Sequence, residues 1–133
     1  MNLTKNFKLV EFASPDADCF PIKVINNLII LAKNLQKLRD YIEGIYIFYP
    51  AIHINSGWRT PEHNKYVGGV SNSQHLYGKA ADIWVAGLSP VDLHAIIIKL
   101  IKRGVMHDGG LGLYDTFNHY DVRENESRWD YRT

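Results

Sequence analysis

Apolar residues recur at helical spacing in the first third of the chain. The positions that lie three or four residues apart are Ile25, Leu28, Leu31, Leu35, Leu38 and Ile42. Such spacing places side chains on one face of an α-helix. Pro21 suits the first turn of this helix, and Gly44 suits its end. We therefore predict a core helix over about residues 21–44, preceded by an arm with apolar anchors over residues 8–12.

Shorter elements follow in the middle of the chain. Residues 52–55 alternate between apolar and polar side chains, which predicts a strand. Thr60 and Pro61 are typical of a helix N-cap and a first helical turn, and Gly68-Gly69 ends this short helix. Residues 80–85 are mainly apolar and predict a short buried strand.

A further helix is predicted over residues 89–104. It begins with Ser89-Pro90-Val91-Asp92, which combines a capping hydroxyl with an acidic residue three positions later. Val91, Ala95, Ile98 and Ile101 or Lys102 continue at helical spacing towards Gly104. Lys99, Lys102 and Arg103 lie near the predicted C-terminus, where cations are favoured.

The chain ends in two predicted strands and a polar tail. Residues 111–114 and 118–123 predict strands joined by a turn. In the tail from Glu124, Trp129 and Tyr131 are candidate docking anchors. The order helix, strand, helix, loop, strand, helix, hairpin favours an α+β fold with an antiparallel sheet over a doubly wound sheet.

Composition fits one ordinary globular domain. The 133 residues are 46% hydrophobic and 22% charged. A chain of this length can bury enough apolar surface to fold without disulfides or structural metals. We therefore predict a single domain over residues 1–133, in which helices flank the antiparallel sheet.

Charge, cysteine content and hydropathy exclude several classes of protein. The formal net charge of +1 predicts no strong attraction to nucleic acid. Cys19 is the single cysteine, which excludes an internal disulfide and a cysteine-rich zinc site. The most apolar segment, residues 28–32, is too short to span a bilayer, and residues 1–8 lead into no apolar core of a secretory signal. We expect a monomer that is made in the cytoplasm without a signal peptide and has no membrane span.

Two predicted strands carry polar residues that suit metal chemistry. Asp82 lies inside an otherwise apolar strand, where a carboxylate is costly unless its charge is compensated. In the last strand His119, Asp121 and Arg123 point to one face, since side chains alternate along an extended chain. A bound cation would compensate the buried charge of Asp82.

A third candidate ligand precedes the first of these strands. His75 is separated from Asp82 by a loop that contains Gly78, which lets the chain turn sharply. With His119 the set becomes two imidazoles and one carboxylate, which suits Zn²⁺ and leaves a fourth position for water. The alternative interpretation is that His75 and His119 are unrelated polar residues.

Several motifs occur in a fixed order along the chain. Residues 73–82 have the pattern Ser-x-His-x-x-Gly-x-Ala-x-Asp, and residues 119–123 have the pattern His-x-Asp-x-Arg. With residues 56–64 (SGWRTPEHN) and 109–114 (GGLGLY), they resemble the M15 family of zinc D-Ala-D-Ala peptidases. This family belongs to the wider group of lysostaphin-type enzymes and the hedgehog signalling domain. The resemblance extends from about Phe7 to Arg123 and is greatest to compact phage and bacterial cell-wall peptidases.

The resemblance implies a role for each motif. His75, Asp82 and His119 correspond to the ligands of a zinc site on the sheet. Arg59 corresponds to an active-site arginine that binds substrate and stabilises charge, and Ser73 to a serine near the substrate, although it could equally cap its own loop. The implied activity of this single zinc peptidase domain is hydrolysis of peptidoglycan peptides, as a carboxypeptidase or an endopeptidase, at the cell wall after a phage-type release.

One position departs from the pattern of the family. Several members carry an acidic base three residues before the last histidine ligand, and this chain has Thr116 there. We predict that Asp121 is the base, because it shares a strand face with His119. Asp121 could instead orient a ligand or pair with Arg123, and Asp115 is another candidate base. The missing acid also leaves open a non-catalytic zinc-containing module that binds the cell wall or a protein.

Overall fold

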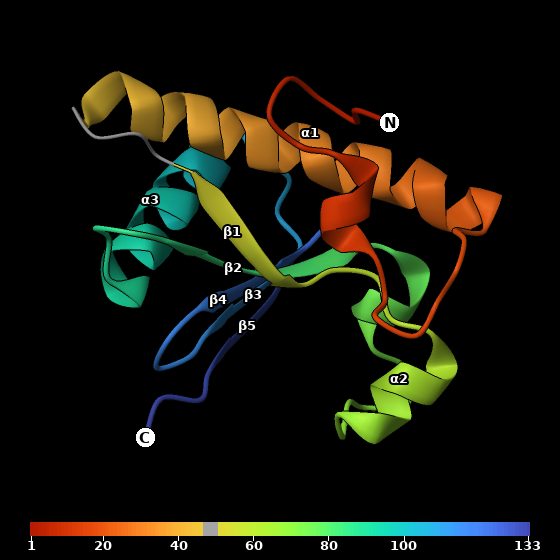
Figure 1. The fold of residues 1–133 in the computed structure, drawn as a ribbon. Coiled ribbons are helices and arrows are strands. Elements are labelled where there is room, and N and C mark those ends of the chain that lie inside the picture. The colour runs from red at the N-terminus through yellow and green to blue at the C-terminus, as the bar shows by residue number, and fades with distance from the viewer. Residues whose placement is uncertain (47–50) are drawn as a thin grey trace.

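The computed structural model, which describes residues 1–46 and 51–133, confirms the predicted order of elements up to residue 123 and adds one strand after it. The helical elements are η1 (Leu9–Phe12), α1 (Ile22–Ile45), α2 (Pro61–Tyr66), η2 (Gln74–Tyr77) and α3 (Pro90–Lys102). The strands are β1 (Ile52–Ser56), β2 (Ala80–Val85), β3 (Gly110–Leu113), β4 (Asn118–Asp121) and β5 (Ser127–Asp130). The α+β fold class is confirmed, with one sheet and helices around it (Figure 1).

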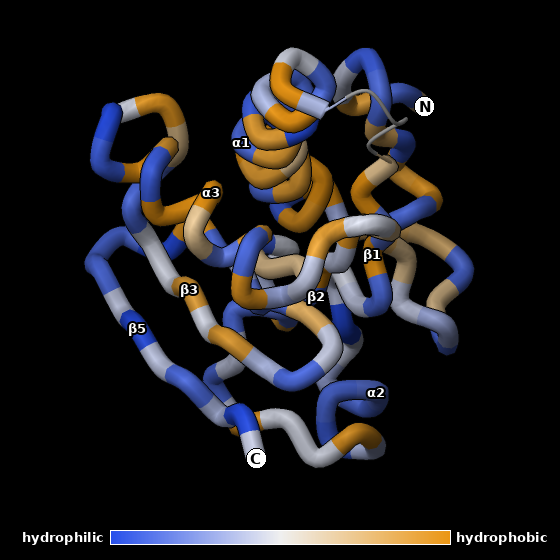
Figure 2. Tube along the Cα trace, turned by 90° about the vertical axis from the view of Figure 1, so that its left-hand side faces the viewer, coloured by the Kyte–Doolittle hydropathy of each residue, from blue (hydrophilic) through white to orange (hydrophobic). Residues whose placement is uncertain are grey.

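The five strands form one sheet in the order β1-β2-β4-β3-β5. Neighbouring strands are antiparallel except β3 and β5, which are parallel. Figure 2 shows α1 and α3 on the same side of the sheet and α2 on the other side. The hydrophobic core fills the space between the two longer helices and the sheet.

Helix α1 buries one apolar stripe, nearly as its sequence predicts. Residues Leu28, Leu31, Leu35, Leu38 and Ile42 have no exposed surface. The first buried position is Val24, whereas Ile25 is only half-buried. Val24 lies four residues before Leu28 and seven before Leu31, which places it in the middle of the stripe, whereas Ile25 is turned about 100° away from Val24.

Helix α3 is present as predicted, but it packs through other residues than those that marked it in the sequence. The side chains that it buries are Leu93, Ile96, Ile97 and Leu100. Val91 and Ala95 are exposed and Ile98 is half-buried, so the spacing that predicted the helix does not mark its buried face. Most residues of this helix are apolar, and apolar spacing alone therefore fits more than one face.

Strand β5 was missed by the sequence analysis, which predicted only a polar tail. Its sequence, Ser-Arg-Trp-Asp, lacks the alternation of apolar and polar residues that marks a strand. It pairs in parallel with β3, and Gly112 lies opposite Trp129 in the register. The strand places Trp129 close to the polar residues of β4, as described below.

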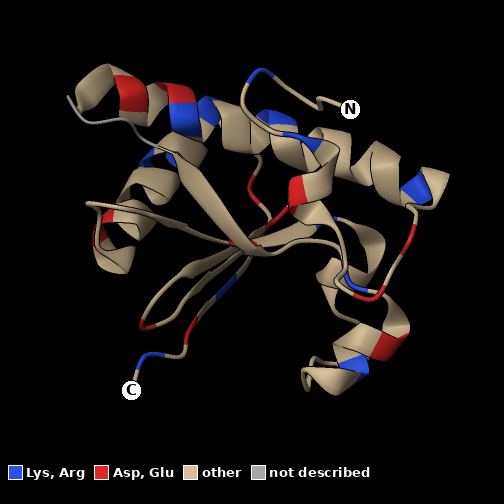
Figure 3. Cartoon of the chain, in the orientation of Figure 1, with Lys and Arg blue, Asp and Glu red and all other residues tan. Residues whose placement is uncertain are grey.

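Charged residues are distributed over the helices and loops. Figure 3 shows acidic and basic residues interspersed along α1 and present near both ends of the chain. This distribution agrees with the small net charge of the sequence. Within residues 1–46 and 51–133, no helix has the length and apolarity needed to cross a membrane.

Gly78 shapes the connection between η2 and β2. Its φ of +72° lies in the left-handed region, and an added Cβ would lie 2.9 Å from the carbonyl oxygen of Val24. We expect Gly78→Ala to lower the free energy of unfolding by about 1–3 kcal/mol, because alanine is strained there. Denaturant unfolding measures the change. Gly44→Ala is the matched control, since nothing lies within 4 Å of its added Cβ, and equal stability of both variants would contradict the expectation.

Candidate metal centre

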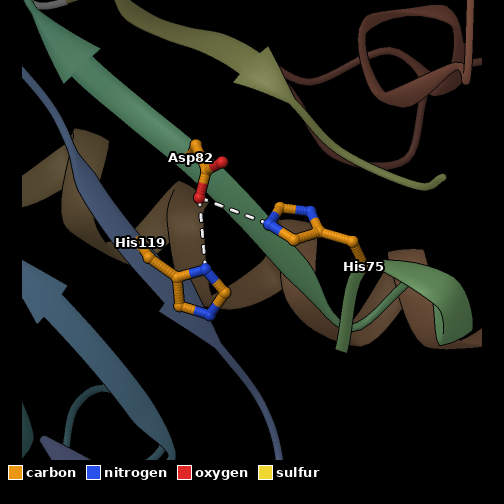
Figure 4. A group of neighbouring side chains, drawn as sticks. All are labelled: His75, Asp82 and His119. Carbon is orange, nitrogen blue, oxygen red and sulfur yellow. Dashed lines mark hydrogen bonds and ion pairs between the residues drawn. The ribbon is translucent and has the colours of Figure 1, made fainter. Parts of the chain in front are cut away.

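The centre forms where β2 and β4 lie side by side. Asp82 of β2 pairs with His119 of β4 in the register of the sheet. Both side chains project from the sheet face opposite the helix α1, because Ile83 and Tyr120, their neighbours in sequence, belong to the core. His75 reaches the same point from η2 (Figure 4). All three residues are buried.

Local hydrogen bonds fix the ring of His75. The side chain of Ser73 caps η2 by accepting a hydrogen bond from the backbone N–H of His75 at 3.2 Å. The ring Nδ1 lies 2.6 Å from the carbonyl oxygen of Gly57. A carbonyl oxygen can only accept, so Nδ1 carries a proton, and in the neutral ring Nε2 then holds the lone pair. This Nε2 lies 3.3 Å from Oδ1 of Asp82.

The ring of His119 is fixed by a carboxylate on its other edge. Its Nε2 donates to Oδ2 of Asp121 at 2.6 Å. Its Nδ1 lies 3.1 Å from Oδ1 of Asp82. In the neutral ring Nδ1 therefore holds the free lone pair and points, like Nε2 of His75, towards the same carboxylate oxygen (Figure 4).

These three atoms fit the geometry of a metal site. One ligand atom from each residue lies within 4.8 Å of the others. A tetrahedral ion with bonds of about 2.1 Å holds its ligands about 3.4 Å apart, close to the 3.3 and 3.1 Å that separate Asp82 from the two imidazoles. The donor set of two nitrogens and one oxygen suits Zn²⁺. The residues predicted as ligands are thus brought together.

The electrostatics of the centre favour a bound positive charge. Burial alone would raise the pKa of Asp82, but hydrogen bonds with His119 and His75 outweigh it and hold the pKa well below its usual range. Burial would also lower the pKa of His119, but the carboxylates of Asp121 and Asp82 raise it above its usual value. A proton is therefore favoured among these side chains, and a divalent cation could be held in its place.

Arg59 lies beside the three candidate ligands and is held by three hydrogen bonds. Its Nε donates to Ser56 at 3.0 Å, and Nη1 donates to Asn64 at 3.2 Å. Its Nη2 lies 3.4 Å from Oδ2 of Asp82, the oxygen that is turned away from the imidazoles. The guanidinium is mostly buried, which excludes the plain surface salt bridge that is the ordinary role of an arginine.

A cavity of about 410 Å³ opens over the centre. His75, Asp82, His119, Arg59 and Ser73 all contribute to its lining. Such a volume lies in the range of sites for small ligands, about 300–1,000 Å³. Ser73 therefore both caps its own loop and faces the cavity, so its two predicted roles are compatible.

Comparison with known proteins agrees with the geometry. The model of the peptidase M15 family matches residues 7–121 of the chain. The chain belongs to the peptidase M15 family. No curated protein matches the sequence. M15 peptidases are metallopeptidases, so the family gives the chain a metallopeptidase type of function, and His75, Asp82 and His119 form a group able to bind the metal.

Asp121 of this M15 peptidase does not face the cavity. Its side chain has no exposed surface, and Oδ2 accepts hydrogen bonds from His119 and Arg123. Its Oδ1 accepts from the backbone N–H of Gly110 at 2.8 Å and from Nε of Arg123 at 2.9 Å. Both carboxylate oxygens of Asp121 are engaged by these hydrogen bonds, and the residue does not line the cavity. The position of Asp121 therefore fits the alternative role of orienting a ligand and does not fit the predicted role of a base.

The other candidate base also lies outside the cavity. Asp115 is exposed and accepts hydrogen bonds from the backbone and hydroxyl of Thr133. Among the described residues that line the cavity of the M15 peptidase, Asp82 is the only one with a carboxylate. The sequence could not show this, because the lining comes from segments far apart in the chain.

Sequence reasoning missed an aromatic wall of this cavity in the M15 peptidase. Tyr114, Trp129 and Tyr131 line it together with the candidate ligands. Burial raises the pKa of Tyr114, and the nearby carboxylate of Asp82 adds to this effect, so the phenol stays protonated at neutral pH. The signal that could have revealed the wall is the pair Gly110 and Gly112, which leaves one face of β3 without side chains.

Proposed function

We propose that this M15 peptidase is a zinc-dependent hydrolase of peptidoglycan, which cuts stem peptides or cross-links at D-alanine. The observation that carries the proposal is the convergence of His75, Asp82 and His119 at one cavity. Two imidazoles and a carboxylate leave a coordination position for water, as in catalytic rather than structural zinc sites. The resemblance to cell-wall peptidases supports the substrate class, and the cell wall, reached by a phage-type release, is the proposed site of action.

The reaction is the addition of water to an amide. The water oxygen bonds to the carbonyl carbon, the carbon–nitrogen bond breaks, and a proton from water goes to the leaving nitrogen. A bound zinc ion would polarise the carbonyl and lower the pKa of the water. The chain itself holds the ligands in place: Gly57 fixes the ring of His75, and Asp121 fixes the ring of His119.

We propose that Arg59 binds a negatively charged group of the substrate. A guanidinium has five N–H donors, and three nitrogens of Arg59 each donate once within the protein. One N–H on each terminal nitrogen has no further partner among the described residues. This pair can bind the carboxylate of a terminal D-alanine or the oxygen that becomes negative during hydrolysis.

Arg59→Lys is expected to lower kcat/KM by about 100-fold, because lysine keeps the charge but loses the planar pair of donors. Steady-state kinetics on two matched peptides separates the roles. If Arg59 binds the terminal carboxylate, KM rises only for the peptide with a free carboxylate and not for its amide. If it stabilises the reacting oxygen, kcat falls for both. Arg103→Lys at the exposed end of α3 is the control, and full activity of the Arg59 variant on both peptides would contradict both roles.

A second function is favoured by one observation. Asp82 is the only carboxylate of the described cavity lining and faces the two imidazoles, so this lining offers no second carboxylate to accept a proton from water. A zinc-containing module that binds the cell wall or a protein without cutting is therefore the alternative.

Digestion of purified peptidoglycan separates the two functions. The protein is incubated with cell walls, with and without a chelator, and soluble fragments are analysed by mass spectrometry. The proposed hydrolase releases new amino groups at peptide bonds only when the metal is present. Binding to the walls without any new amino group would contradict the hydrolase and support the module.

A further inference from the structure

Tyr114 presents a hydroxyl group to the cavity with its proton uncommitted. It follows β3 and lines the same cavity as the three candidate ligands and Arg59. Nε1 of Trp129 donates to the phenol oxygen at 3.0 Å. An indole N–H can only donate, so the phenol oxygen is the acceptor and its own proton points elsewhere. Within the part of the chain that the structure describes, no protein group accepts that proton.

The ring of Tyr114 is held from two sides. Phe117 stacks on it, with ring centroids 4.4 Å apart and planes at 10°. Tyr131 meets it edge-on, with centroids 5.7 Å apart. Stacking and edge contacts between aromatic rings restrict both rings to a narrow range of orientations. The hydroxyl of Tyr114 therefore has a defined position before any substrate binds.

Trp129 packs beside the candidate metal centre, in a space that Gly112 leaves open. A Cβ added to Gly112 would overlap the indole ring, at 2.2 Å from its Nε1, so only glycine leaves room for Trp129 at this place. The indole lies 4.9 Å from the ring of His119 and under the guanidinium of Arg123 at 5.4 Å. Trp129 lies beyond residues 7–121, the segment that the family model matches.

Two residues of the cavity lining, Arg59 and Tyr114, have donor hydrogens without a partner among the described residues. Arg59 is a charged donor and Tyr114 is a neutral one, while Asp82 is the one described carboxylate in the lining and faces the two imidazoles. Amide hydrolysis concentrates negative charge on the former carbonyl oxygen, where preorganised donors have their largest effect. A fixed phenol with an uncommitted proton is such a donor.

We propose that Tyr114 is a further catalytic residue, whose hydroxyl donates a hydrogen bond to the carbonyl oxygen of the scissile amide. The inference rests on the proposed function. Water adds to the carbonyl carbon, the carbon–nitrogen bond breaks, and a proton from water ends on the leaving nitrogen. Tyr114 keeps its own proton throughout. Trp129 is a positioning residue, which occupies the phenol oxygen and so directs the proton of Tyr114 into the cavity.

The test compares Tyr114→Phe with the parent protein in three measurements. We expect kcat/KM on a D-alanyl-D-alanine peptide to fall about 100-fold, mainly through kcat. Affinity for a phosphinate analogue of that peptide, whose charged oxygens mimic the tetrahedral state, is expected to fall about tenfold. Zinc content is expected to stay the same, because Tyr114 is not among the candidate ligands. Tyr66→Phe, the same change at an exposed position of α2, is the control.

Trp129→Phe tests the positioning role. It removes the N–H while keeping an aromatic ring, and we expect a smaller fall in kcat with KM unchanged. In a double-mutant cycle, adding Trp129→Phe to Tyr114→Phe should cause little further loss, because both changes remove the same hydrogen bond to substrate. Fully additive losses would overturn the positioning role.

The outcomes separate this inference from the proposed function. A parent protein that releases no product contradicts the proposed function, and the phosphinate affinities still test Tyr114. An active parent together with a Tyr114→Phe variant of equal kcat/KM and equal phosphinate affinity overturns the role of Tyr114 alone.

Discussion

Replacing Asp82 by asparagine is expected to abolish zinc binding and, with it, peptide hydrolysis. Oδ1 of Asp82 lies within 3.3 Å of both candidate imidazole nitrogens, so this oxygen joins the two halves of the centre. Asparagine has the same shape but carries no charge, and it removes the only negative ligand of the set. Replacing a residue that hydrogen-bonds to a metal ligand lowers metal affinity by roughly 10- to 100-fold. We expect a larger loss of zinc affinity from Asp82→Asn, because this change alters a ligand itself.

Zinc content after dialysis and calorimetric titration with zinc measure this effect. Asp18→Asn is the matched control, because Asp18 is exposed in the loop before α1. The control should bind about one zinc ion per chain, as we expect of the parent. An Asp82→Asn protein with the zinc affinity of the parent would exclude Asp82 as a ligand.

Replacing Asp121 by asparagine is expected to weaken zinc binding by about 10- to 100-fold without removing it. The buried carboxylate accepts the Nε2–H of His119, which leaves Nδ1 free to bind the metal. It also accepts hydrogen bonds from Gly110 and Arg123, and an amide cannot replace all of them. We therefore also expect a loss of about 1–3 kcal/mol in the free energy of unfolding, as buried donors lose their acceptor.

Activity at saturating zinc distinguishes the two roles considered for Asp121. If Asp121 orients His119, excess zinc should restore a substantial part of the activity of the Asp121→Asn variant. If Asp121 accepts the proton from water, zinc affinity should stay unchanged and excess zinc should restore nothing. The second result would contradict the position of Asp121 behind His119.

The candidate ligands could be named from the sequence because local rules and the resemblance to the M15 family agree on them. Alternation along a strand placed Asp82 and His119 on defined faces, and a glycine-containing loop allowed His75 to return to them. The same rule placed Asp121 on the face of His119, which the structure shows. Alternation cannot tell on which edge of the imidazole a carboxylate lies, or whether it faces solvent. The role of Asp121 therefore depended on contacts with Gly110 and Arg123 that only the fold supplies.

The cavity wall could not be predicted because it depends on a strand without a strand pattern. Strand β5 contains one large apolar residue, Trp129, and is held mainly by its pairing with β3. The sequence indicates the space for Trp129 only indirectly, because Gly112 has no side chain. Tyr114 likewise appears in the sequence only as the end of a glycine-rich motif, although its ring contacts Phe117 and Tyr131 at the cavity.

Crystallography at the zinc absorption edge tests the central claim most directly. Anomalous scattering from crystals of the zinc-loaded protein should give one strong peak, about 2.0–2.2 Å from Nε2 of His75, Oδ1 of Asp82 and Nδ1 of His119. No peak at these three atoms, or a peak held by other side chains, would contradict the account of this protein as a metal-dependent peptidase.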